Sequence, residues 1–89
     1  MNSSTTKRFR QMLAKLPNNI RQQAKDAYRL FRENPYHPSL RFKKVHNTES
    51  IYAVRININY RAVGVVDSGK IVWFWIGPHA EYEKLLDVL

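Results

Sequence analysis

The sequence contains no cysteine and only three glycines, and these shortages exclude several kinds of site. Without thiols there is no disulfide framework and no thiolate metal site, as is typical of proteins from a reducing compartment. Three glycines are too few for a Gly-rich phosphate-binding loop. The three histidines also lack the spacing of metal ligands, so we expect neither a metal ion nor a cofactor.

Long hydrophobic runs are missing as well. The longest apolar stretch, residues 71–77, is far too short to cross a bilayer. The first residues lead into basic side chains without the apolar segment of a secretion signal, and no predicted helix has the strongly apolar face that inserts into a membrane surface. The sequence therefore predicts a cytoplasmic protein that acts away from membranes.

Acidic residues are scarce. Seven Asp and Glu stand against fifteen Lys and Arg, which gives a formal net charge of +8 at pH 7. Residues 1–47 hold eleven basic and two acidic side chains, a net charge of +9, whereas residues 48–89 hold four and five, a net charge of −1. Such a charge distribution attracts polyanions, so we expect a nucleic acid or an acidic protein segment as the partner.

The first half of the chain has the periodicity of two helices. A first helix can be capped by Thr5 or Thr6 and then carries apolar residues at helical spacing. A second helix begins near Ile20 and ends before Pro35, because proline does not continue a helix. Its outer side carries four basic residues, which form either a solvated face or a docking surface: Arg21, Lys25, Arg29 and Arg32.

The second half of the chain has the composition of strands. Three segments rich in β-branched and aromatic residues follow a basic segment, so that the predicted strand region comprises residues 41–46, 51–56, 60–66 and 71–76. The last segment is apolar throughout, which predicts a central strand buried on both faces. Residues 80–89 can form a short closing helix. We therefore expect one α+β domain over residues 1–89, with two N-terminal helices packed on a small, mainly antiparallel sheet of about four strands.

Three polar side chains in this region are candidates for chemistry. Arg55 and Arg61 lie in successive predicted strands, where each forms surface ion pairs with Glu49 or Asp67 or binds a phosphate, and the strand register decides whether the two arginines meet. His79 follows the last strand, either as a proton donor or as an ordinary surface residue. Cations and a histidine suit metal-free RNA cleavage, which needs a base at the 2′-hydroxyl and an acid at the leaving 5′-oxygen.

Three short motifs, in this order, resemble the RelE/ParE toxin superfamily of bacterial toxin-antitoxin systems. They are Tyr-Ala-Val-Arg at 52–55, Asn-Tyr-Arg-Ala-Val at 59–63, and Trp-Ile-Gly-Pro-His at 75–79 followed by Tyr82. The resemblance covers most of the chain and implies a ribosome-dependent mRNA interferase, an endoribonuclease that cuts mRNA without a metal ion and thereby inhibits translation. It also implies a cognate antitoxin protein as partner, and the net charge favours capture of an acidic segment of that antitoxin.

The resemblance assigns roles to individual residues. Arg61 matches the arginine that supports the scissile phosphate, His79 falls where some members carry a histidine as general acid, and Tyr82 lies close to the C-terminal aromatic of the motif. His46 is the predicted general base, with Lys44 and Glu49 as alternatives. The predicted RNA-binding residues are Arg41, Lys43, Lys44 and Arg55. The superfamily also contains ParE toxins directed at gyrase and inactive members, so a non-catalytic gyrase inhibitor and an inactive binding module are the alternative functions.

Overall fold

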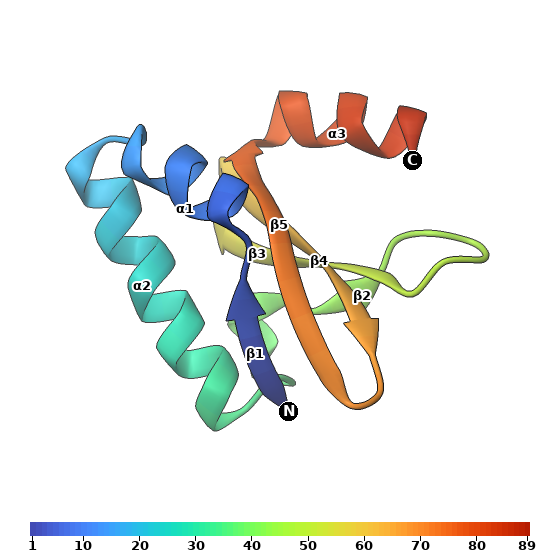
Figure 1. Ribbon diagram of the computed structural model, residues 1–89. Coiled ribbons are helices and arrows are strands. Elements are labelled where there is room, and N and C mark those ends of the chain that lie inside the picture. The colour runs from blue at the N-terminus through green and yellow to red at the C-terminus, as the bar shows by residue number, and fades with distance from the viewer.

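The computed structural model describes all 89 residues and contains three α-helices, one short 3₁₀ helix and five strands (Figure 1). The helices are α1 (Lys7–Ala14), α2 (Asn18–Glu33), the 3₁₀ helix η1 (Pro38–Leu40) and α3 (His79–Val88). The strands are β1 (Asn2–Thr5), β2 (Lys43–Lys44), β3 (Ile51–Asn57), β4 (Tyr60–Asp67) and β5 (Lys70–Pro78). The predicted α+β class is confirmed, and so are the two N-terminal helices and the closing helix. None of these helices combines the length and the apolar character needed to span a lipid bilayer.

The strands form one sheet in the order β1-β5-β4-β3-β2. Every neighbouring pair is antiparallel except β1 and β5, which run parallel. The sheet is therefore mainly antiparallel, as predicted, but it has five strands where about four were expected. The register places the end of β3, the start of β4 and the end of β5 side by side, close to the point where α3 begins (Figure 1).

The additional strand is β1, which the sequence analysis did not predict. Its residues are polar and show no alternation of apolar side chains, so its local preference for a strand is weak. Distant residues hold it in place: the indole Nε1 of Trp73 donates to Ser3 Oγ over 2.9 Å, and the Tyr28 hydroxyl donates to the Ser3 carbonyl over 3.1 Å. Contacts with residues distant in the sequence therefore stabilise β1 as a strand.

Helices α1 and α2 cover one face of the sheet, and the main hydrophobic core lies between these two layers (Figure 1). Thr6 caps α1, as predicted, because its Oγ1 accepts from the backbone N–H of Phe9 over 3.0 Å. The fully buried Phe31 of α2 meets Trp73 of β5 edge-on, with ring centroids 5.3 Å apart. The packing of the two helices therefore holds the sheet in place from one side.

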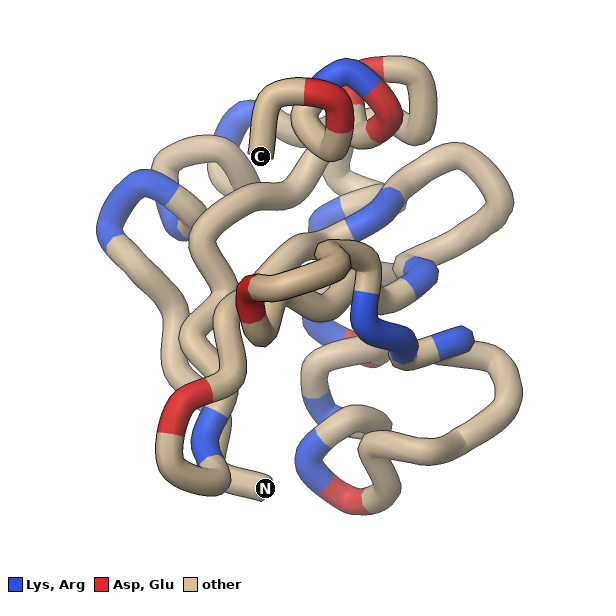
Figure 2. Tube along the Cα trace, turned by 90° about the vertical axis from the view of Figure 1, so that its right-hand side faces the viewer, with Lys and Arg blue, Asp and Glu red and all other residues tan.

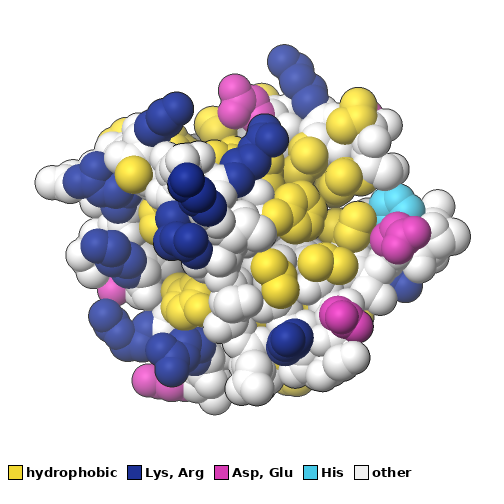
Figure 3. All heavy atoms as spheres, in the orientation of Figure 1, with side chains coloured by type: hydrophobic (Ala, Val, Ile, Leu, Met, Phe, Trp, Pro, Cys, Tyr) yellow, Lys and Arg dark blue, Asp and Glu magenta, His cyan; other side chains and the backbone are white.

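The opposite face of the sheet is covered only in part, by α3. Tyr82 packs there against a small cluster of Ile51, Ala53 and Val63. Figure 3 shows hydrophobic side chains exposed beside β5 and below α3, while Lys and Arg side chains gather over α1 and α2. The prediction for residues 71–76 was therefore wrong in two respects: β5 lies next to the edge strand β1 and not at the centre, and Phe74 on it is only half-buried.

Candidate functional site

Most of the predicted site residues converge on a small pocket where α3 begins. The cavity has a volume of about 100 Å³ and collects side chains from β2, β3, β4, α3 and the segment just before β2. Figure 2 shows Lys and Arg on these strands below the more acidic α3. The pocket is lined by Arg41, Lys43, Ala53, Val54, Arg55, Arg61, His79 and Tyr82. Six of the eight predicted site residues are among them, so the strand order brings together residues far apart in the sequence.

Arg55 and Arg61 face each other across β3 and β4. The two residues are register partners, which settles the question that alternation alone left open. Neither arginine forms an ion pair with Glu49 or Asp67. The two ion pairs in the molecule join Arg29 to Asp26 and His79 to Glu83. Two guanidinium groups without a carboxylate between them make a site that favours a phosphate.

The Arg61 side chain is held by the turn between β3 and β4. Its Nη1 donates to the carbonyl oxygens of Asn57 and Tyr60 over 2.7 and 3.0 Å. Burial lowers the pKa of the Arg61 guanidinium, and the positive charge of Arg55 lowers it further. Arg61 is therefore a fixed cation in a positive environment, positioned before any ligand arrives.

His79 is the first residue of α3, and its backbone N–H donates to the Asn59 carbonyl over 2.8 Å. One ring nitrogen, Nε2, lies 2.7 Å from Glu83 Oε1, one helical turn further along. The other nitrogen, Nδ1, is shielded from solvent and has no hydrogen-bond partner. The ring also lies beside that of Tyr82, with centroids 5.7 Å apart.

Tyr82 lines the pocket and is itself buried. Burial raises the pKa of its hydroxyl, the positive charge of Arg61 lowers it, and the negative charge of Glu83 raises it again, with a net increase. The phenol therefore stays protonated at neutral pH and can donate a hydrogen bond to a ligand oxygen.

The basic segment before β3 contributes unequally to the pocket. Lys43 pairs with Ala53 and lines the cavity, whereas Lys44 pairs with Tyr52 and faces the other side of the sheet. Arg41 also lines the cavity, although its backbone lies in the left-handed region with φ 46°. The structure thus places Arg41 and Lys43 at the pocket and Lys44 away from it.

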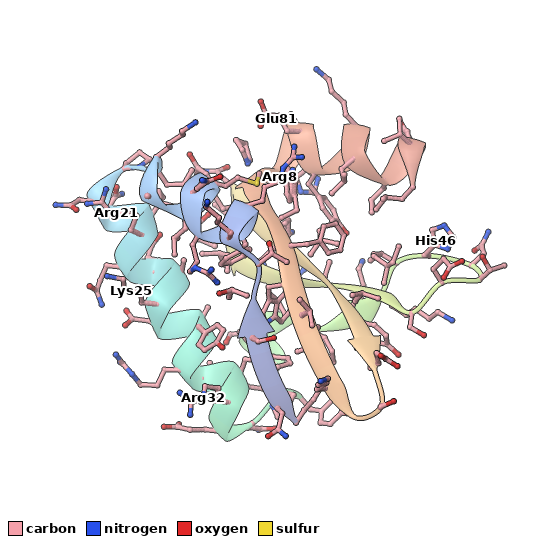
Figure 4. The ribbon with its side chains drawn as sticks, in the orientation of Figure 1. Arg8, Arg21, Lys25, Arg32, His46 and Glu81 are labelled. Carbon is pink, nitrogen blue, oxygen red and sulfur yellow. The ribbon has the colours of Figure 1, made fainter.

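His46 does not line the pocket. It lies on the loop between β2 and β3, well away from the start of α3 where Glu81 is labelled (Figure 4). Its Nδ1 accepts from the backbone N–H groups of Thr48 and Glu49 over 3.2 and 2.9 Å. In this structure His46 therefore shapes its own loop, and the alternative base Glu49 lies on the same loop.

The basic residues of α2 lie on a different part of the surface. Figure 4 shows Arg21, Lys25 and Arg32 projecting from the side of α2 away from the sheet. Arg21 donates to the Leu16 carbonyl over 3.3 Å and to the Asn18 side chain, so it supports the turn between the two helices. Lys25, Arg29 and Arg32 border a groove of about 440 Å³ between α1 and α2.

Sequence reasoning missed Glu83. The spacing of four residues between His79 and Glu83 in a predicted helix is the signal that identifies such a pair.

As for metal ligands, no group of three or more His, Cys, Asp or Glu side chains in the molecule could hold a metal ion.

Solved toxin structures share this fold at low sequence identity. RelE in the RelB–RelE antitoxin-toxin complex from Methanococcus jannaschii matches with a TM-score of 0.73 and 20% identity, over 91% of this chain and 95% of that chain. YafQ from Escherichia coli matches with a TM-score of 0.72 and 8% identity, over 91% and 96%. The isolated RelE toxin from E. coli matches with a TM-score of 0.65 and 18% identity, over 99% and 98%. The fold is therefore that of the RelE-like toxins.

The sequence itself identifies the family. A family model described as the ParE-like toxin domain matches residues 18–84, which include every pocket residue. The chain belongs to the ParE-like toxin domain family, within the RelE/ParE superfamily that its motifs indicated. A sequence search of the curated proteins found no match.

Proposed function

We propose that this protein is the toxin of a toxin-antitoxin pair and acts as a ribosome-dependent endoribonuclease that cuts mRNA without a metal ion. The observation that carries the proposal is the convergence of Arg61, His79 and Tyr82 on one pocket rich in arginine. Membership of the ParE-like toxin domain family and the RelE-like fold support it.

In the proposed reaction the 2′-hydroxyl of the mRNA attacks the adjacent phosphate, and the 5′-oxygen of the next nucleotide leaves. Arg55 and Arg61 stabilise the charge that develops on the phosphorane. His79 gives a proton to the leaving oxygen, and the protonated hydroxyl of Tyr82 orients the substrate by a hydrogen bond. Each of these groups lines the same cavity.

The base that takes the 2′-hydroxyl proton comes from outside the pocket in this proposal. His46 remains our proposed base, and it lies on the β2–β3 loop outside the pocket. A part in the reaction then requires this loop to move toward the pocket when mRNA binds. Lys43 and Arg41, which line the pocket, hold the flanking RNA in the proposal, and Lys44 is expected to contact RNA from the other side of β2.

The test is cleavage of mRNA on translating ribosomes by the purified protein. We expect the His79→Ala, Arg61→Ala double variant to lose at least about a hundredfold in cleavage rate, because a general acid alone contributes that much. Lys70→Ala is the matched control: it removes a cation at the other end of β5, and its cleavage should equal that of the wild type. Equal cleavage by the double variant and the wild type rejects the assignment of the reaction to Arg61 and His79.

A second candidate is a non-catalytic toxin that inhibits gyrase, since the matching family model is described as ParE-like. This alternative predicts that DNA supercoiling by gyrase falls when the protein is added. It also predicts that growth arrest survives His79→Ala. An inactive binding module, the third alternative, causes no growth arrest on expression.

We also propose a cognate antitoxin as the partner of this chain. The related RelE from M. jannaschii was solved as an antitoxin-toxin complex, and the net charge of +8 here favours an acidic segment. A short neighbouring reading frame encoding an acidic or DNA-binding protein is the expected genomic context. Co-expression of the two proteins should relieve the growth arrest.

A further inference from the structure

The His79 imidazole has neither ring nitrogen free to meet a substrate. Its Nε2 lies 2.7 Å from the carboxylate of Glu83, and its Nδ1 is shielded from solvent without a partner. Nδ1 is also the only buried side-chain nitrogen or oxygen in the molecule that lacks a hydrogen bond. An unpartnered buried polar atom is unfavourable, so this ring orientation must be maintained by the contact on its other nitrogen.

This orientation does not suit proton donation to a bound RNA. A general acid must come within hydrogen-bonding distance of the oxygen that receives its proton. The nitrogen that is accessible here is occupied by Glu83, which lies one helical turn from His79 and does not line the pocket. The ring must therefore leave Glu83 before it can act on a phosphate ester held by Arg55 and Arg61.

We propose that Glu83 holds His79 in a resting orientation and that RNA in the pocket draws the imidazole away from it. The inference rests on the proposed nuclease function and adds a positioning residue to it. A phosphate in the pocket brings negative charge close to both side chains, which attracts an imidazolium and repels the carboxylate. Occupation of the pocket and release of His79 are then coupled.

The His79–Glu83 contact has the properties of a contact that opens easily. Both side chains are substantially exposed, at 45% and 67%, and ion pairs at such positions are weak because water and salt screen them. The groups that face the ring from the pocket side are Tyr82, which packs beside it, and the cations Arg41, Lys43, Arg55 and Arg61. None of these offers the carboxylate that Glu83 provides, so the removal of Glu83 alone should free the ring.

The first experiment measures the ring itself, without any assay of activity. The ¹⁵N NMR shifts of the imidazole nitrogens report which nitrogen carries the proton, and His37 and His46 serve as internal references. We expect Glu83→Ala to move the His79 nitrogen signals and to leave those of His37 and His46 in place. Glu81→Ala is the matched control, because Glu81 is an exposed acid of the same helix without a histidine partner. His79 signals that are the same in the wild type and Glu83→Ala overturn the proposal.

The second experiment compares single-turnover mRNA cleavage at saturating ribosomes. Release of the ring should speed cleavage by Glu83→Ala by about 1.4- to 5-fold, the range for loss of an exposed ion pair. Glu81→Ala should cleave at the wild-type rate, and Glu83→Gln, whose amide oxygen still accepts from Nε2, should lie between. Slower cleavage by Glu83→Ala also overturns the proposal, since Glu83 then orients the productive ring. If the wild type cleaves nothing, the nuclease function fails, and the NMR comparison still decides whether Glu83 sets the ring orientation.

Discussion

Tyr82 is the residue at which burial and charge oppose each other most directly. Burial raises the pKa of its hydroxyl and outweighs the effect of Arg61, which lowers it. In the unfolded chain the phenol ionises near its ordinary pKa of 10.0, so between that value and the higher pKa of the folded state only the folded protein keeps the proton. Tyr82 therefore stabilises the fold below about pH 10, and this contribution is lost as the pH rises above it.

We predict from this that the free energy of unfolding of the wild type falls more steeply above pH 10 than that of Tyr82→Phe, which cannot ionise. Urea unfolding at a series of pH values measures both slopes. Tyr36→Phe is the control, because Tyr36 is 75% exposed. If Tyr82→Phe and the wild type keep parallel pH profiles, the Tyr82 hydroxyl does not titrate as its burial requires.

The pocket residues could be predicted only in part from the sequence, because strand order determines some of their positions and loop conformation determines others. Arg61 lies at the start of β4, and His79 and Tyr82 lie in the first turn of α3, which directly follows β5. The order of the strands then brings the three residues together. His46 depends on how a loop closes, and the loop amides that its Nδ1 accepts from are not encoded in any short motif. The contact of Glu83 with His79 needs only helical spacing, so the sequence did contain that signal.

Strand β1 is the element whose stability depends most clearly on distant contacts. The Trp73 indole donates to Ser3 Oγ, whereas the neighbouring Ser4 is exposed and makes no side-chain hydrogen bond. We predict that Ser3→Ala lowers the free energy of unfolding by about 1–3 kcal/mol, because it leaves the indole N–H of the buried Trp73 without a partner. Urea unfolding of Ser3→Ala and of the matched control Ser4→Ala measures the difference. A loss of the same size in both variants contradicts the role of the indole contact.

Elements with local signals were predictable, and those that depend on partners were not. Thr6 and Pro35 mark helix ends through capping and backbone chemistry, which act within a few residues. β1 has no such signal, because its polar residues gain their strand geometry only beside β5. The apolar run of β5 wrongly predicted a central strand buried on both faces, because composition reveals neither the parallel pairing with β1 nor how much of the second face α3 covers.

The molecule as a whole carries its positive charge mainly in its first half, with a net +9 over residues 1–47. If the pocket binds RNA phosphates, affinity for a single-stranded RNA should fall linearly on a plot of log K against log salt, by about 0.7 per phosphate contacted. We predict that the Arg41→Ala, Lys43→Ala double variant reduces this slope by about 1.4, twice that value. Fluorescence anisotropy at several salt concentrations measures it. Lys70→Ala should retain the wild-type slope, and an equally reduced slope in this control shows that the binding is not centred on the pocket.

The facing arginines of β3 and β4 have a consequence for the lifetime of the free molecule. Arg55 and Arg61 are held opposite each other without an acidic neighbour, so the empty fold stores electrostatic repulsion. Any anion that bridges them removes that repulsion and binds only the native form, which shifts the folding equilibrium toward it. The protein without a bound polyanion therefore unfolds more readily than the bound protein. Proteases that attack unfolded chains will degrade the unbound protein first.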